Sequence, residues 1–375
     1  MRSINEILPS DVLSAIFKAC LAMDNNYASG GTPLVVLNII LVCTTWRKIA
    51  AAIPDLWTII EVNRRTVGMD DYIIRGMAKW ISQARHLPIS LVFKLRAGEF
   101  TKVRLSPIMP WVNLTALELT DWAFDPRETI YILNQAPKMT DLHLIGIGGV
   151  PGGGCPYYIA IITHPSLKSL VIEFRSATHL PGGIGIKTVI HPLFHGLILP
   201  HLIELEIGAS HSAVDYQLLP SLLQLHGRSS FRLARLHLHE LLFDVEELKV
   251  LLMRLPTLKE LHLETRTMYH SFSQLLPLLT EFTPDAHEMI LPLLESVFIA
   301  DNISSEEWNV VENGSLDMLE ARMWEGTPGS VSPLKSATLL WGNIGGYLFE
   351  AIDGSVTRAK LLVDDGLELV FPPLL

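Results

Sequence analysis

The sequence predicts a mixed α/β protein, in which a block of three helices is followed by a solenoid of parallel strands and helices. Two patterns support this prediction. Apolar residues recur at helical spacing within residues 1–57, and a Leu-x-x-Leu-x-Leu pattern recurs through the rest of the chain with helical segments between its copies. Strands that alternate with helices run parallel and line one face, while the helices line the other. We expect the strands on the concave face and the helices on the convex face.

The first helix of the N-terminal block is expected to begin near Pro9 and Asp11. Proline suits a first helical turn, and a negative charge there interacts favourably with the positive end of the helix dipole. The apolar residues that follow lie along one stripe, at Val12, Leu13, Ile16, Phe17, Cys20 and Leu21. Three helices of this length bury only a small core, so we expect a partner to complete the burial.

Two further helices complete the block, one starting at Pro33 and one ending before Pro54. We expect the earlier one to place Leu34, Leu37, Ile40 and Leu41 on one side. The later one carries Trp46, Ile49, Ala50 and Ile53. By their size, Trp46 and Trp57 are the expected core residues of the block.

Four short signatures of this block occur in a fixed order. They are Leu8-Pro9, then Val12-Leu13 with Ile16-Phe17, then Leu41-Val42-Cys43 followed by Trp46-Arg47, and finally Pro54-Asp55-Leu56-Trp57. With these signatures the block resembles an F-box, although its loop near residues 24–32 is longer than in the shortest family members. Loops of this kind tolerate insertion at small entropic cost.

The F-box resemblance implies a partner and a role. In that family the motif docks on the Skp adaptor, which links it to a cullin scaffold and to a RING subunit that carries a ubiquitin-conjugating enzyme. The implied role is therefore that of a substrate receptor. The implied adaptor-binding residues are Leu8, Pro9, Val12, Leu13, Ile16, Phe17, Leu41, Val42 and Trp46. The alternative is a plain helical bundle without an adaptor, because amphipathic patterns also arise by themselves.

The Leu-x-x-Leu-x-Leu pattern has eight copies. They begin at Leu114, Met139, Leu167, Leu202, Leu233, Leu258, Leu294 and, weakly, Leu334. Over residues 87–345 the array resembles degenerate leucine-rich repeats, although the spacing between copies is longer and less regular than the usual 20–29 residues or so. With the F-box, this arrangement is similar to the expanded F-box family of mushroom-forming fungi.

The chain is expected to divide into four segments. Residues 1–57 form the F-box, 58–113 a connecting helix and strand unit, 114–345 the irregular repeats and 346–375 a C-terminal cap. Strands are expected at residues 57–62 and 88–95, and helices at 70–84, 125–135, 213–226, 244–255 and 306–324. The tail is expected to supply a last pair of strands, at 361–363 and 367–371, because the open end of a solenoid needs a cap.

The residues between the motif leucines should point out of the core, onto the concave face. The middle position of each copy gives a row of eight residues: Glu118, His143, Val171, Glu206, His237, His262, Phe298 and Thr338. Flanking positions add Asp141, Glu173, Glu204, Arg235, His239, Glu260 and Glu264. We expect Glu118, His143, Glu206, His237, His262 and Phe298 to bind a protein substrate.

We consider three interpretations of this acidic, histidine-bearing face. It can be a solvated sheet face, a surface for a protein that carries basic residues, or a metal site. A metal needs ligands at about 2.0–2.2 Å, whereas parallel strands lie about 4.8 Å apart, so only neighbours such as His237 and His262 could share an ion. We expect this face to bind a protein, and we expect neither a metal nor a cofactor. An acidic face argues mildly against a phosphorylated substrate.

Composition narrows the possible functions. The chain has 375 residues and a formal charge of −10, which argues against nucleic acid or an anionic membrane as a general partner. Three widely spaced cysteines favour a reducing compartment. The chain lacks a signal-peptide pattern, and its most apolar run, residues 34–43, is about half of a membrane span. We therefore expect a protein of the cytoplasm or nucleus.

Motifs for catalysis are missing from the sequence. There is no Gly-x-Ser-x-Gly elbow and no HExxH pair. Glycine-rich segments occur at 146–154 and 181–188, but the second fails as a phosphate loop because Ile186, not glycine, precedes Lys187. The sequence thus predicts a non-catalytic substrate receptor of a ubiquitin ligase. The alternatives are a scaffold that engages no ligase and, from another class, a hydrolase or nucleotide enzyme built on the glycine-rich loops.

Overall fold

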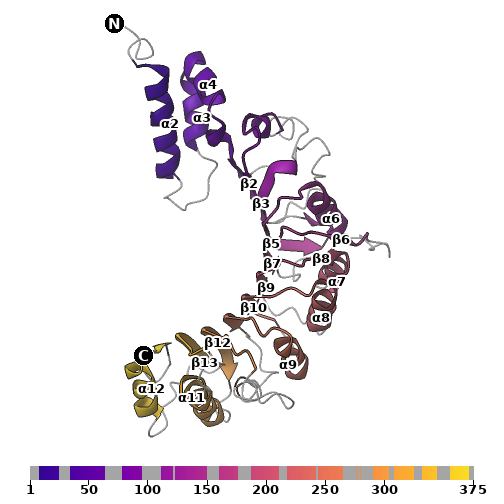
Figure 1. Ribbon diagram of the computed structural model, residues 1–375, viewed down its shortest axis with the longest axis vertical. Coiled ribbons are helices and arrows are strands. Elements are labelled where there is room, and N and C mark those ends of the chain that lie inside the picture. The colour runs from indigo at the N-terminus through magenta and orange to yellow at the C-terminus, as the bar shows by residue number, and fades with distance from the viewer. Residues whose placement is uncertain are drawn as a thin grey trace. The chain divides into compact units, whose positions relative to one another are not determined.

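The structure, a computed structural model, is a mixed α/β fold with a large parallel sheet and helices (Figure 1). It describes residues 8–24, 34–63, 78–94, 111–120, 123–149, 160–175, 187–210, 218–241, 244–264, 276, 279, 290–303, 308–324, 332–343 and 355–370. The chain forms two compact units. Unit 1 comprises Met1–Val150 with His164–Leu167, and unit 2 comprises Pro151–Thr163 with Lys168–Leu375.

Unit 1 begins with three helices and a short 3-10 turn, which together we call the helical block. The helices are α2 (Ser10–Asp24), α3 (Leu34–Val42) and α4 (Thr44–Ala51), and the turn is η1 (Pro54–Trp57). The first turn of α2 is closed by the Leu13 amide, which donates to the Pro9 carbonyl at 3.1 Å. Cys43 caps α4, because its Sγ accepts from the Trp46 amide at 3.4 Å. Proline at the start of η1 stops α4, as expected.

The core of the helical block is small and partly aromatic. Phe17 is fully buried and its ring lies 5.0 Å from that of the half-buried Trp46. Trp57 is also buried, and its Nε1 donates to the Ala50 carbonyl at 2.9 Å. The indole of Trp57 meets that of Trp80 edge-on, at 5.1 Å between centroids. Trp57 is thus a core residue, as the sequence predicts, and Trp46 covers the edge of that core.

The four residues expected on one side of α3 include one, Leu41, that is exposed. Among the side chains that the structure describes in this helix, Val36 and Ile39 are buried and Ile40 is half-buried. All residues of α3 except Asn38 are apolar, so no polar stripe marks its outer side. The side chains of Leu34 and Leu37 lie outside the described residues.

The sheet of unit 1 has parallel strands in the order β1, β2, β3, β5. Their bounds are Ile59–Asn63, Ile89–Lys94, Leu114–Thr120 and Asp141–Gly149, and the short strand β4 (Ala123–Phe124) pairs with the end of β5. A 3-10 turn, η2 (Trp111–Asn113), precedes β3. Helix α6 (Pro126–Gln135) follows β4 and is capped by Asp125, whose Oδ1 accepts from the Arg127 amide at 2.9 Å.

The sheet of unit 2 continues the same plan with seven parallel strands. In order these are β7 (Ser169–Arg175), β9 (Glu204–Ser210), β10 (Arg235–His239), β11 (Glu260–Glu264), β12 (Ser296–Ile303), β13 (Ser336–Asn343) and β14 (Glu368–Val370). A separate short pair joins β6 (Ile162–Thr163) to β8 (Leu197–Ile198). The parallel arrangement follows because a return segment separates each strand from the next.

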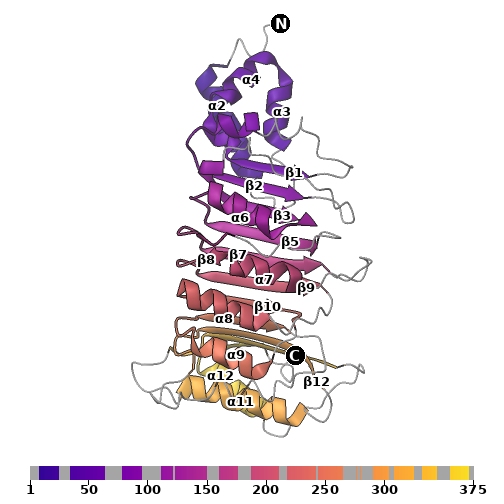
Figure 2. The same ribbon diagram turned by 90° about the vertical axis from the view of Figure 1, so that its right-hand side faces the viewer.

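Helices occupy most of the return segments of unit 2. They are α7 (Lys187–His195), α8 (Leu218–Ser229), α9 (Val245–Met253), α11 (Trp308–Trp324) and α12 (Ser355–Asp364). Figures 1 and 2 show α7, α8 and α9 along one and the same face of the strands. None of the helices within the described ranges is long and apolar enough to cross a membrane.

The motif leucines form the core between the strands and these helices. In β10, for example, Leu236 and Leu238 are buried, while Arg235, His237 and His239 alternate with them. The same alternation holds in β11, where Leu261 and Leu263 are buried. The motif therefore assigns the inward and outward positions of the central strands correctly. Within the described part of unit 2, α7, α8 and α9 leave the other face of these strands uncovered, and we call it the helix-free face (Figures 1 and 2).

Several predicted boundaries need correction. The segment 361–363 belongs to helix α12 and not to a strand, since Ala359 and Leu362 are buried three residues apart, as on one side of a helix. Among the described residues, β14 is the last strand of the sheet. The segment 146–149, expected as a loop, extends strand β5, with Gly146 at a positive φ of 64°. The first strand starts at Ile59 because Trp57 belongs to η1. The glycine-rich residues 181–186 and most of the expected helix at 70–84 lie outside the described residues.

Candidate functional site

The residues expected to bind the adaptor differ in burial and include core, half-buried and exposed side chains. Leu13 and Phe17 are core residues, whereas Pro9 is exposed and Leu8 and Trp46 are half-buried. Four large apolar side chains remain exposed, which we call the exposed quartet: Val12 (40%), Ile16 (41%), Leu41 (71%) and Val42 (58%).

The exposed quartet comes from two helices that pack against each other, α2 and α3. Val12 and Ile16 are one turn apart on α2 and therefore share a side of that helix. Leu41 and Val42 are the last two residues of α3. Single exposed apolar residues are ordinary, but four in a block of this size provide apolar area that another protein can cover.

The second candidate region is the helix-free face of the sheet in unit 2. Strand register places Glu206, His237, His262 and Phe298 directly opposite one another on β9, β10, β11 and β12. Val171 and Thr338 continue the row on either side. The predicted row is therefore real within unit 2, because the motif copies align the strands without a shift.

The two remaining predicted residues lie in unit 1. Glu118 and His143 are partners on β3 and β5, in a row that also contains Glu61 and Val92. The Thr120 hydroxyl donates to Glu118 Oε1 at 3.2 Å.

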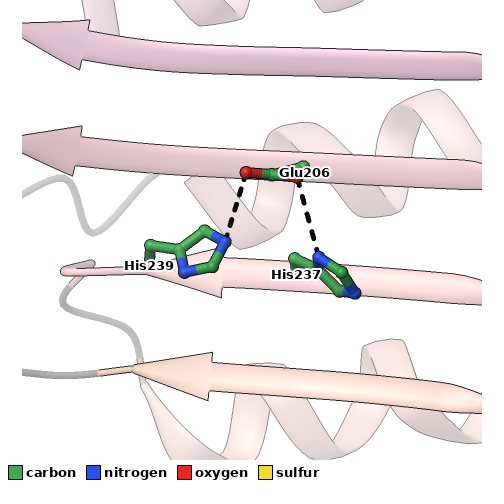
Figure 3. A group of neighbouring side chains, drawn as sticks. All are labelled: Glu206, His237 and His239. Carbon is green, nitrogen blue, oxygen red and sulfur yellow. Dashed lines mark ion pairs between the residues drawn. The ribbon is translucent and has the colours of Figure 1, made fainter. Parts of the chain in front are cut away.

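Glu206 is the centre of a cluster of histidines and carboxylates. One of its oxygens lies 3.6 Å from His237 Nδ1, and the other lies 3.4 Å from His239 Nε2 (Figure 3). The two imidazoles point to Glu206 from the same strand, β10, because residues two apart share a face. We refer to Glu206, His237, His239, His262, Glu260 and Glu264 as the histidine cluster.

Each of the two imidazoles beside Glu206 has a second carboxylate behind it. His237 Nε2 lies 3.1 Å from Glu260 Oε1, within hydrogen-bonding distance. His239 Nδ1 lies 3.6 Å from Glu264 Oε2. Both rings are therefore held between two acids, one on each neighbouring strand.

His262 completes the cluster on the apolar side. Its ring centroid lies 4.4 Å from that of His239 and 5.3 Å from that of His237. The ring also stacks on Phe298, at 3.8 Å and 21°. His262 Nε2 is buried and has no hydrogen-bond partner among the residues that the structure describes. His239 Nε2 is likewise buried without a hydrogen-bond partner among the described residues, although Glu206 Oε1 lies 3.4 Å from it.

The electrostatics of the cluster follow from these contacts. The imidazoles of His237 and, second, His239 hold the pKa of the adjacent Glu206 carboxylate far below its usual range. The pKa of His237 is raised, chiefly by the neighbouring Glu206 carboxylate and despite partial burial. The pKa of His262 falls to about 4, because burial disfavours its charged form and the neighbouring imidazoles add repulsion. At neutral pH the cluster is therefore anionic at Glu206 and neutral at His262.

Next to the histidine cluster, two further residues of opposite charge pair across neighbouring strands. Arg235 Nη2 donates to Glu204 Oε2 at 2.7 Å, which lowers the pKa of Glu204 and raises that of Arg235. Arg235 is the one cation among the flanking residues that the sequence placed on this face, whereas Glu173, Glu204, Glu260 and Glu264 are all acids. The face therefore has an acidic excess.

A hollow of about 190 Å³ opens next to the cluster. It is lined by Glu173, Glu206, Gly208, Ala209, His239, Glu240 and Glu264. Gly208 keeps it open, because a Cβ there would lie only 3.3 Å from Glu173 Cγ and 3.4 Å from His239 Cβ. The lining of the hollow is mostly polar, and its volume is large enough for a side chain or an ion.

Sequence reasoning named His239 only as a flanking residue and did not name Gly208. The signal for His239 was present in the alternation His237-Leu238-His239, which places both imidazoles on one face. No comparable signal marks Gly208, since its role depends on side chains from two neighbouring strands.

Comparison with known proteins adds no relative to this description. Neither a scan of the sequence against protein-family models nor a search of curated proteins finds a match.

Proposed function

We propose that the chain is the substrate-recognition subunit of a Skp–cullin–F-box type ubiquitin ligase. In this proposal the helical block is an F-box that docks on the Skp adaptor, and the strand and helix units are degenerate leucine-rich repeats that bind a protein substrate. The chain itself supplies no catalytic residue. It raises the effective concentration of the substrate lysine near the loaded conjugating enzyme.

One observation carries the proposal. The exposed quartet, Val12, Ile16, Leu41 and Val42, consists of residues from the very signatures by which the block resembles an F-box. Two other signature residues of α2, Leu13 and Phe17, are buried in the core that holds this helix in place. Covering exposed apolar area stabilises a complex by about 25 cal/mol per Å². An adaptor seated on α2 and α3 would bury this area.

The repeat part of the proposal is supported by the packing of unit 2. Motif leucines such as Leu236 and Leu261 lie in the core, and the strands run parallel in register. The helix-free face has an acidic excess, so the proposed substrate presents basic residues to it. Glu206, His237, His262 and Phe298 lie at the middle of that face, and Glu118 and His143 lie in the corresponding row of unit 1.

Binding of the purified full chain to the Skp adaptor tests the proposal. We expect the wild type to bind, and a Leu41→Asp, Val42→Asp double variant to bind at least tenfold more weakly, because the charges would have to be buried in the interface. The matched control is Val250→Asp with Met253→Asp, which charges two exposed apolar residues of α9. That control should bind like the wild type.

Two outcomes would overturn the adaptor proposal. One is a well-folded wild type that does not bind the adaptor, which would favour a scaffold that engages no ligase. The other is equal binding by the quartet variant and the α9 control. Circular dichroism of each variant separates loss of docking from loss of fold.

A further inference from the structure

The histidine cluster contains two sets of side chains whose donor atoms converge. Glu206, His237 and His239 each offer one ligand atom, and these atoms lie within 4.8 Å of one another. The same is true of His239, His262 and Glu264. The sets share His239, so the cluster presents three imidazoles and two carboxylates within one small area of the sheet.

From this geometry we propose that Glu206, His237 and His239 bind a divalent transition-metal ion of the zinc class. Imidazole nitrogen and carboxylate oxygen are common zinc ligands, at distances of about 2.0–2.2 Å. The inference concerns the sheet face to which substrate binding was assigned above, but it does not depend on adaptor docking. The ion would be bound whether or not the helical block engages a ligase.

The spacing of the donor atoms suits such an ion. In a tetrahedral zinc site, neighbouring ligand atoms lie roughly 3.3 Å apart, given bonds of 2.0–2.1 Å. Glu206 Oε1 lies 3.4 Å from His239 Nε2, and its other oxygen, Oε2, lies 3.6 Å from His237 Nδ1. The third edge joins the ligand atoms of the two histidines, which lie within 4.8 Å of each other.

The strand register fixes the backbone positions of the three proposed ligand residues. Glu206 and His237 are direct partners across β9 and β10, and His239 is the next residue along β10 on the same face. Neighbouring parallel strands keep this separation near 4.8 Å, so an ion between them has ligands on both strands. A site on rigid strands needs little ordering on binding.

The strongest support comes from the nitrogens that face away from Glu206. His237 directs Nδ1 to Glu206 and Nε2 to Glu260, at 3.1 Å. His239 directs Nε2 to Glu206 and Nδ1 to Glu264, at 3.6 Å. A metal-bound histidine usually donates its other ring N–H to a carboxylate or carbonyl, which fixes the tautomer and raises ligand basicity. Both histidines already have that second carboxylate.

The cluster also has room for a further ligand. His239, Glu206 and Glu264 line the hollow beside Gly208. Three protein ligands and a position that opens onto such a hollow allow a water molecule or an outside side chain to complete the coordination. His262, whose ring centroid is 4.4 Å from that of His239, is the nearest further imidazole.

Protons compete with the ion for the same atoms. Zinc binds the unprotonated imidazole nitrogen, so a proton on the nitrogen that faces the ion must leave before the metal can bind. Affinity should therefore rise with pH.

Calorimetric titration of the full chain with ZnCl₂, after treatment with a chelator and desalting, tests the proposal. We expect one ion per chain. Cobalt(II), used as a probe in a second titration, should give the intense visible bands of a tetrahedral site. His239→Ala should weaken zinc binding at least tenfold and abolish the cobalt bands, and Glu206→Gln should do the same. Glu260→Gln, which removes only a supporting carboxylate, should weaken binding by roughly tenfold.

The matched control is His191→Ala. His191 and His195 lie one turn apart on α7, with ring centroids 6.3 Å apart, and are a second histidine pair among the described residues of unit 2. This control should bind zinc like the wild type. Absence of zinc binding by the folded wild type overturns the proposal, as does loss of binding in the His191 variant together with full binding in His239→Ala. His237→Gln, a milder change, replaces His239→Ala if the latter fails to fold.

The result is distinguishable from that of the adaptor experiment. A chain that binds zinc but not the adaptor keeps the metal site and loses the ligase proposal. A chain that binds the adaptor but not zinc keeps the ligase proposal and loses the metal site.

Discussion

The imidazole of His164 bridges two backbone groups and does so only when it is neutral. Its Nδ1 accepts from the Leu167 amide at 3.2 Å, so the proton must be on Nε2, which lies 3.0 Å from the Ala136 carbonyl and donates to it. The ring is buried, and burial lowers the pKa of His164 below that of a free histidine. Protonation at Nδ1 would remove the acceptor that the Leu167 amide uses.

This arrangement predicts that unit 1 is destabilised by mild acid. Because the folded-state pKa lies below the unfolded value of about 6.5, the contribution of His164 is complete above pH 6.5 and is lost as the pH falls toward the folded-state pKa. We expect His164→Gln to lower the free energy of unfolding at pH 7.5 by about 1–2 kcal/mol, since one of the two hydrogen bonds is lost. The difference from wild type should shrink at pH 5. Urea unfolding at both pH values measures it, and a difference independent of pH would contradict the assignment.

A buried arginine ties α11 to the chain before β12. Arg322 is buried on α11, and its guanidinium donates to the carbonyls of Leu279, Ile290 and Leu291 at 3.0, 2.6 and 3.0 Å. Burial lowers the pKa of Arg322 to about 10, so it is still charged at neutral pH. The guanidinium reaches all three carbonyls because its donors are spread over a planar fork.

We expect Arg322→Met to lower the free energy of unfolding by about 3 kcal/mol or more. The substitution leaves three carbonyls without their charged donor, and each unsatisfied buried group costs roughly 1–3 kcal/mol. Arg322→Lys should recover only part of this loss, because one ammonium cannot reach all three oxygens. Arg254→Met, at an exposed position after α9, should change stability by less than about 0.5 kcal/mol. Chemical denaturation of the three variants measures the free energy of unfolding that each one loses. An equal loss of stability in Arg322→Met and Arg254→Met would be inconsistent with this account.

The sequence could predict the site on the sheet because one pattern governs both burial and register. Leu236 and Leu238 of β10 are followed by Leu261 and Leu263 of β11 in the same phase. Aligning these leucines is enough to place His237 beside His262. Burial of one face strongly specifies register, since a shift of one residue would turn the leucines outward.

Other features depended on information that a local pattern lacks. Apart from Asn38, every residue of α3 is apolar, so neither Leu41 nor Val36 could be assigned inside or outside by periodicity. The segment 361–363 is β-branched or leucine in sequence, yet tertiary packing of Ala359 and Leu362 made it helical. Arg322 reads as an ordinary helical cation, because its carbonyl partners lie 31 to 43 residues earlier.

The core of the helical block can be separated experimentally from its exposed quartet. Phe17 is fully buried against Trp46, whereas Val12, five residues earlier on α2, is exposed. We expect Phe17→Ala to destabilise the block by about 3–5 kcal/mol through the lost burial and the cavity that remains. Val12→Ala should cost less than about 0.5 kcal/mol.

Thermal unfolding followed by circular dichroism and tryptophan fluorescence distinguishes the two variants. A large loss in Val12→Ala would mean that this residue is not on the surface. Phe17→Ala should lose adaptor binding together with the helical signal. Val12→Ala should change adaptor binding and keep the helical signal.

Arg358 fastens the last helix of the described chain to its neighbour. Its Nε and Nη2 donate to Glu320 Oε1 and Oε2 of α11 at 2.7 and 2.8 Å, and Nη2 also donates to Asp317 at 2.6 Å. These carboxylates raise the pKa of Arg358. Paired donors of this kind require the planar guanidinium, which lysine lacks.

We expect Arg358→Lys to weaken the attachment of α12 by about 1 kcal/mol, which corresponds to roughly fivefold more opening of that helix. Hydrogen exchange measures this directly: amides of α12 and β14 should exchange faster, while those of β9 and β10 keep their protection. Lys360→Gln, an exposed change on the same helix, is the control and should leave exchange as in the wild type. Because the pair is partly exposed, raising the salt concentration should narrow the difference between wild type and Arg358→Lys. Unchanged protection of α12 in Arg358→Lys would mean that its buried Ala359 and Leu362 hold the helix in place without the ion pair.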